Sequence, residues 1–129
     1  MIREDYIMKL VKEMIRTMLK LLFDIDIDEP SAELLNEAEK QEYDALTAQI
    51  DAGEINEAED RLYDWMEQQP ERADHENARL PILFYAYLNR KSEDYLEEHD
   101  FSREEVELGL RSIAGKEGLM SLAETFLNP

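Results

Sequence analysis

Residues 4–23, EDYIMKLVKEMIRTMLKLLF, decide the fold class of this chain. Their large apolar side chains recur at steps of three and four residues, the spacing that places side chains on one face of an α-helix. The pattern predicts a long amphipathic helix over residues 1–23. Its apolar residues spread over about half of the circumference at ~100° per residue, which is more than one neighbouring helix needs. A narrow stripe of four basic side chains lies on the opposite face, at Lys9, Lys12, Arg16 and Lys20.

The surplus of apolar surface on this helix leaves three interpretations open. The helix packs as an ordinary core helix, pairs with a copy of itself, or lies on an anionic membrane. We expect core packing, with the excess face as the self-interface of a possible homodimer through Met8, Met14 and Met18. A membrane is the weaker interpretation, because four basic side chains give only a modest attraction to anionic lipids. The charged residues also interrupt the apolar run, so the helix is not expected to be a membrane span or a signal peptide.

An acidic linker, DIDIDEP, follows at residues 24–30. Its three alternating aspartates occupy the first ligand positions of an EF-hand calcium loop. However, Glu29 stands where that loop needs glycine, and Leu35 stands where it needs the closing glutamate. The segment therefore predicts no metal site. Ile25 and Ile27 alternate with the aspartates, so we expect a short extended segment with the isoleucines inward and the acids in water.

The rest of the chain, residues 31–129, carries helical periodicity that is divided by glycine, proline and capping residues. We expect one all-α domain of antiparallel helical hairpins over residues 1–129, with about six or seven helices. After the first helix, the expected helices are one from Ser31 to Gly53 with Ala38 inward, one from Asn56 to Gln69, one through Leu80 to Leu88, a short one after the cap Ser92, one that opens at the capping box Ser102–Glu105 with Leu108 inward, and one from Leu119 to Leu127.

Residues 42–70 resemble part of a tetratricopeptide repeat, a helical hairpin with small residues at the close contact and a proline at its end. Gly53, Ala58, Leu62 and Pro70 stand in the register of the second half of that repeat. The first half does not match, since glutamate, alanine, leucine and glutamine stand where the repeat usually has tryptophan, leucine, glycine and tyrosine. The resemblance implies a repeat-like hairpin in the middle of the chain. It does not imply a peptide-binding array, which needs about three stacked units.

Three further segments carry a second resemblance, which covers nearly the whole chain. They are DYIM at residues 5–8, LFYAYL at residues 83–88 and DYLEEHDFSREE at residues 94–105. With these segments the chain resembles a small uncharacterised all-helical family of Gram-positive, often gut-dwelling, bacteria. The resemblance implies a bacterial context and brings no activity with it.

The net charge of −18 is concentrated in the middle of the chain. Residues 24–77 carry nineteen acidic and three basic side chains, whereas residues 1–23 carry three acidic and five basic ones. So acidic a segment repels phosphates, which makes nucleic acid an unfavourable partner and a basic protein or peptide a favourable one. The alternative is that the charge only keeps the surface solvated. The chain has no cysteine, which excludes disulfides and thiolate chemistry and is typical of a cytoplasmic protein.

Neither histidine belongs to a metal-binding motif. Arg72 stands three residues before His75 and Leu96 three residues before His99, so the Glu-x-x-His pattern of di-iron bundles is absent. The sequence also has no zinc-binding His-Glu-x-x-His, phosphate-binding glycine loop or Gly-x-Ser-x-Gly motif. We therefore expect no catalytic residue, no metal and no cofactor. The competing hypothesis is a small-molecule or metal-dependent enzyme with a pocket between hairpins, which a buried carboxylate beside either histidine in a deep cleft would favour.

The remaining candidates for function are acids and tyrosines of the middle helices. Aromatic residues at 84, 85 and 87 cannot all face one side of a helix, so at least one is expected to look away from the others. Tyrosine in an acidic surround suits a basic or amphipathic peptide. The sequence thus predicts a non-enzymatic interaction or assembly module. Its candidate partner-binding residues are Tyr43, Glu57, Asp60, Tyr63, Asp64 and Tyr85.

Overall fold

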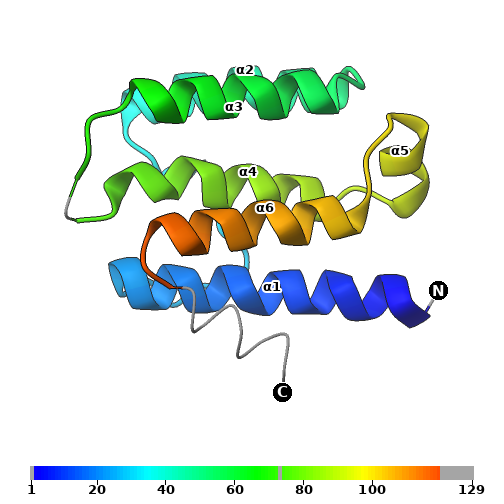
Figure 1. The fold of residues 1–129 in the computed structure, drawn as a ribbon, viewed down its shortest axis with the longest axis horizontal. Coiled ribbons are helices and arrows are strands. Elements are labelled where there is room, and N and C mark those ends of the chain that lie inside the picture. The colour runs from blue at the N-terminus through cyan, green and yellow to red at the C-terminus, as the bar shows by residue number, and fades with distance from the viewer. Residues whose placement is uncertain (1, 73, 120–129) are drawn as a thin grey trace.

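The computed structural model describes residues 2–72 and 74–119, which form six α-helices and two short 3-10 helices (Figure 1). No strand occurs in those two ranges, so the all-α prediction is confirmed for them. In chain order the elements are α1 (Ile2–Phe23), η1 (Ala32–Leu34), α2 (Glu37–Asp51), α3 (Ile55–Gln68), η2 (Glu76–Ala78), α4 (Arg79–Asn89), α5 (Glu93–Glu98) and α6 (Arg103–Lys116).

The helices lie in three layers. α4 and α6 occupy the middle, with α1 on one side and the antiparallel α2–α3 hairpin on the other, while the short α5 closes one end (Figure 1). Gly53 makes the turn of the hairpin with a φ of 86°, in the left-handed region that glycine adopts without strain. α2 packs against α4, so the hairpin has one face on α4 and one face directed outward.

α1 packs against both α4 and α6, which explains its wide apolar face. Its side chains Val11, Met14 and Met18 are at most 2% exposed. A single neighbouring helix would cover only part of the apolar face of α1, and a second helix of the same chain covers a further part of it. The structure thus corrects the expected position of Met14 and Met18, which lie in the core of the single chain and not on a surface.

α4 is buried on nearly all sides. Its sequence has no charged residue between Arg79 and Arg90, and a helix that is apolar all round is typical of a buried one. Every residue from Leu80 to Ala86 is buried. Pro81 fits because it lies in the first turn, where the backbone N–H that proline lacks has no partner within the helix. The core of the molecule is therefore built around this helix.

The acidic linker shows the expected alternation of inward and outward side chains, after a left-handed turn at Asp24 with a φ of 56°. Ile25 and Ile27 pack against the core, and the three aspartates are exposed. Arg16 and Lys20 of α1 form ion pairs of 2.8–3.3 Å with these aspartates. Among the described residues no group of three metal-ligating side chains occurs, here or elsewhere. Two of the four side chains of the basic stripe on α1, Arg16 and Lys20, therefore serve to hold the linker.

The second helix begins at Glu37 and not at Ser31. The hydroxyl of Ser31 caps only the single turn of η1. α2 has its own capping box, in which the Asn36 side chain accepts from the Glu39 N–H at 2.8 Å and the Glu39 carboxylate accepts from the Asn36 N–H at 2.9 Å. As a result Ala38 is exposed, and Glu39 takes the buried position beside it.

The last third of the chain follows the capping signals of the sequence. Ser92 and Ser102 each accept a hydrogen bond from the N–H three residues on, at 3.1 and 3.2 Å. α6 runs without a break to Lys116. Leu108 is 57% exposed, contrary to expectation. Residues 120–127, most of the expected last helix, lie outside the described residues.

Candidate functional site

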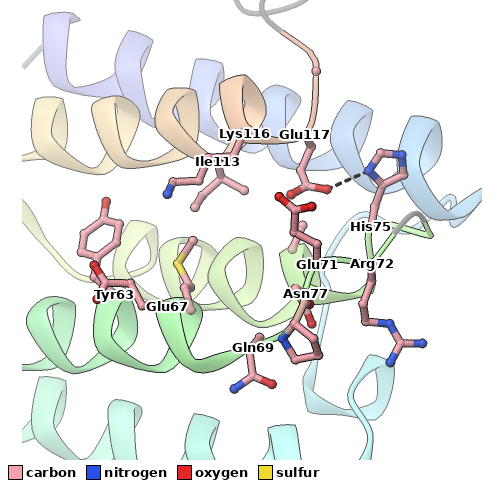
Figure 2. Close-up of a pocket in the computed structure, with 14 residues that line it drawn as sticks. Tyr63, Glu67, Gln69, Glu71, Arg72, His75, Asn77, Ile113, Lys116 and Glu117 are labelled. Atoms are coloured by element: carbon pink, nitrogen blue, oxygen red, sulfur yellow. Dashed lines mark hydrogen bonds and ion pairs between the residues drawn. The ribbon is translucent and has the colours of Figure 1, made fainter.

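A cleft of about 890 Å³ opens between α3, the connection to α4 and the end of α6 (Figure 2). Its volume falls within the range of ligand pockets, about 300–1,000 Å³. The residues that line it are Tyr63, Met66, Glu67, Gln69, Pro70, Glu71, Arg72, His75, Asn77, Ala78, Ile113, Lys116, Glu117 and Gly118.

A chain of hydrogen bonds runs from the interior to one wall of the cleft. The Tyr85 hydroxyl donates to Oε2 of Glu59 at 2.6 Å, and the hydroxyl oxygens of Tyr85 and Tyr63 are 3.1 Å apart. Tyr85 has one hydroxyl hydrogen, which goes to the carboxylate, so Tyr63 donates to Tyr85. The oxygen of Tyr63 is left with only lone pairs for the cleft that it lines.

Packing holds this chain in place. The Tyr85 side chain is fully buried, and its ring lies where a side chain on Gly109 would stand: a Cβ there would be 2.2 Å from Cζ of Tyr85. Burial raises the pKa of Tyr85 well above its usual range, and its hydrogen bonds to Glu59 and Tyr63 raise it further. Burial also raises the pKa of Glu59, against the opposing effect of the hydrogen bond from Tyr85.

His75 and Glu117 join two walls of the cleft. Nδ1 of His75 lies 2.7 Å from Oε1 of Glu117, and the His75 backbone is left-handed, with a φ of 62°. A carboxylate beside a histidine in a cleft is the arrangement that favours the enzyme hypothesis. In Figure 2, however, the second ring nitrogen of His75 points away from the cleft. The pair therefore links the connection before α4 to the end of α6.

Carboxylates outnumber free cations around the cleft. Glu67 and Glu71 are exposed, and no described residue forms an ion pair with either. Arg72 points away from the cleft in Figure 2 and pairs with Asp74 and with Glu76. The one lining cation without a described ion-pair partner is Lys116.

A second feature, which we call the acidic stripe, lies along α3. It consists of Glu57, Asp60, Asp64 and Glu67, all exposed and spread over an arc of about 80° at ~100° per residue. None of the four forms an ion pair with a described residue, whereas neighbouring Arg61 is bound by Glu42 of α2 at 2.8 Å. Each pair of like charges three or four residues apart destabilises a helix by about 0.2–0.5 kcal/mol. The stripe therefore costs helix stability, and only Glu57 is compensated, by its place in the first turn near the positive end of the helix dipole.

The six candidate partner-binding residues do not form one surface. Glu57, Asp60 and Asp64 lie together on the acidic stripe. The other three belong elsewhere, as Tyr63 lines the cleft, Tyr85 is in the core, and Tyr43 is 9% exposed with its ring edge-on to Tyr87. Tyr43 and Tyr85 are thus corrected from surface to interior positions. The lack of charged residues between Arg79 and Arg90 is the signal that indicates burial of Tyr85.

Apart from Tyr63 and His75, sequence reasoning did not single out the polar residues that build the cleft. Glu117 lies where the sequence predicts a break between helices, and its contact with His75 spans 42 positions. Glu59 and Glu71 have no local pattern that separates them from the many other acids. Of the candidate self-interface residues only Met8 reaches the surface, half-buried at a hollow of about 120 Å³ between α1, α4 and the linker. His99 packs edge-on to Tyr95, with ring centroids 4.5 Å apart.

None of the described helices is both long enough and apolar enough to cross a membrane. A family model described as "Family of unknown function (DUF6483)" matches residues 1–118 of the chain. No curated protein and no solved structure matches it. The likeness to a tetratricopeptide repeat and the Gram-positive context therefore stay predictions.

Proposed function

Since the chain belongs to the DUF6483 family of unknown function, which brings no activity with it, we propose from its surface geometry that it is a non-enzymatic module that binds a basic protein or peptide. The observation that carries this proposal is the acidic stripe. Its four carboxylates stand on the outward side of the hairpin without ion-pair partners among the described residues. A basic segment laid along α3 would remove the repulsion between them.

The charge of the whole chain supports the same partner. A net charge of −18 attracts a basic molecule over a distance of about one Debye length, ~8 Å at physiological salt, and speeds its association. Phosphates are repelled by the same field, which is why nucleic acid is not the proposed partner. The proposal therefore rests on the negative charge of the acidic stripe and on the negative net charge of the whole chain.

The two other hypotheses have less support. For an enzyme, the cleft carries a His75–Glu117 pair, but the free ring nitrogen of His75 points out of the cleft. For a membrane-binding helix, Arg16 and Lys20 of the basic stripe are engaged by the aspartates of the linker. That leaves fewer basic side chains for anionic lipid.

The test compares two variants with the same change of charge. E57Q/D60N/D64N neutralises three members of the acidic stripe, and D44N/E97Q/E98Q neutralises three exposed acids on α2 and α5. The probe is a synthetic amphipathic helix of leucine and lysine, with binding measured by fluorescence anisotropy at two salt concentrations. We expect the stripe variant to bind about tenfold more weakly, and the control within about twofold of the natural chain, because close charge pairs dominate over distant screened ones.

Equal weakening by both variants would contradict the proposal, since it would mean that only net charge attracts the probe. Circular dichroism of both variants checks that the helices are retained. Unchanged binding by the stripe variant would contradict it as well.

A further inference from the structure

Several polar groups in the lining of the cleft are free to accept hydrogen bonds. Tyr63 donates its only hydroxyl hydrogen inward, to Tyr85. The amide nitrogen of Gln69 donates to a backbone carbonyl at 3.0 Å, and that of Asn77 donates to the carbonyl of Pro70 at 2.6 Å. Each of the two amides keeps its oxygen as an acceptor and a second N–H as a donor. A ligand that brings donors therefore finds acceptors at Tyr63 and at both amide oxygens.

The charged groups of the cleft require the same chemistry. Figure 2 shows the carboxylates of Glu71 and Glu117 pointing toward one another across the gap between the chain segments. Their repulsion is relieved when a cation lies between them. Lys116 is the one lining cation that is not already engaged by described carboxylates, because Arg72 faces the other way. An anionic ligand would meet more carboxylates than free cations.

The apolar part of the lining fits an alkyl chain. It is formed by Met66, Pro70, Ala78 and Ile113, between the polar groups named above. Lysine and arginine bury their methylene stems on such surfaces and keep the charged head at polar groups. A bare metal ion would leave the apolar lining unused, and no group of three metal-ligating side chains is found among the described residues.

The cleft is also continuous with the acidic stripe. Glu67 belongs to both, as the last carboxylate of the stripe on α3 and as a lining residue of the cleft. We propose that the cleft is an anchor site for an arginine or lysine side chain of the basic partner that lies along the acidic stripe. This inference rests on the proposed function and adds the point at which the partner is held.

The experiment uses a probe too short to span the stripe. The blocked peptide acetyl-Ala-Ala-Arg-Ala-Ala-amide is titrated into the full chain, with citrulline in place of arginine as the control, because citrulline keeps the shape and removes the charge. Binding is followed by the amide signals of the protein in nitrogen-15 NMR spectra. We expect the arginine peptide to shift the signals of Met66 and Ile113, and the citrulline peptide to leave them in place.

Two variants of the cleft test the residues. E71Q removes a lining carboxylate and Y63F removes the acceptor hydroxyl, while both keep the size of the side chain. Each is expected to weaken the binding of the arginine peptide by about three- to tenfold, which is the range for partly exposed charged and hydrogen-bonded contacts. The variant D44N/E97Q/E98Q, far from the cleft in sequence and on other helices, is expected to leave its binding unchanged.

The two probes separate the two proposals. Equal binding of the arginine and citrulline peptides, shifts confined to signals outside the cleft, or full binding by both cleft variants would overturn the anchor site and leave the acidic stripe standing. Loss of discrimination between the stripe and control variants with the leucine–lysine helix would overturn the proposed function, whatever the arginine peptide does. Thermal unfolding of E71Q and Y63F shows whether a weaker affinity comes from the site or from a loss of fold.

Discussion

At the scale of single residues, Gly109 and Tyr85 show how one missing side chain makes room for another. The ring of Tyr85 is fully buried at the place that a Cβ on residue 109 would occupy. That close approach holds the Tyr85 hydroxyl between Glu59 and Tyr63. The hydrogen-bonded chain that reaches the cleft thus depends on a glycine in the middle of α6.

Replacing this glycine by alanine tests the contact. G109A gains about 1 kcal/mol of helix propensity, but the added Cβ overlaps a ring that has no free space to move into, at a cost of about 1–3 kcal/mol or more. We expect a net loss in the free energy of unfolding, measured with urea. S112A, at an exposed position of the same helix, is the control and is expected to be neutral or slightly stabilising. A stabilised G109A would show that the ring can move aside.

At the scale of helices, the end of α2 is attached to the end of α4 by a small polar cluster. Asp51 accepts from the Tyr87 hydroxyl at 2.7 and 2.8 Å and from Nζ of Lys91 at 2.7 Å. The Lys91 ammonium also lies 5.0 Å from the ring centroid of Tyr87 and 5.1 Å from that of Tyr95. These contacts help to fix the hairpin that carries the acidic stripe on the core helix.

The cluster should give stability that depends on pH. The hydrogen bond from Lys91, followed by that from Tyr87, lowers the pKa of Asp51 in the folded chain. A lowered folded pKa stabilises the fold above the unfolded value, about pH 3.9, and this contribution is lost as the pH falls through the folded value. Because Asp51 is half exposed, we expect D51N to cost about 1 kcal/mol or less at neutral pH.

Urea unfolding of the natural chain and D51N at about pH 7 and about pH 3 measures this contribution. The difference between the two proteins is expected to shrink at the lower pH. D44N, which removes an exposed acid from the same helix, is the control. A difference that grows on acidification would contradict the assigned cause of the lowered pKa.

At the scale of the whole molecule, α1 packs against both α4 and α6 instead of standing apart as a binding element. Met14 is 2% exposed, whereas Leu21 on the same helix is 58% exposed. A pair of glutamate substitutions therefore distinguishes core from surface on one helix. It also tests the proposal of a homodimer. Because Met14 and Met18 are buried, such a dimer would have to form through the remaining exposed apolar side chains of α1, among them Leu21.

We expect M14E to lose the fold, because an unpaired carboxylate in an apolar core costs several kcal/mol, a large part of the total stability of a small domain. L21E is expected to keep its circular dichroism. Light scattering gives the solution mass of each. A dimeric natural chain that becomes monomeric in L21E would place Leu21 at a self-interface, whereas a folded M14E would contradict the core position of Met14.

The sequence by itself determined the helices and much of what they bury. Apolar periodicity, capping serines and the alternation of Ile25 and Ile27 with aspartates act over a few residues, so they can be read without knowing the fold. Only the tertiary structure decided that the surplus face of α1 meets two helices, that Tyr43 and Tyr85 are interior, and that His75 meets Glu117. Those outcomes depend on contacts between distant segments, and among so many acids no local pattern marks the few that converge on one cleft.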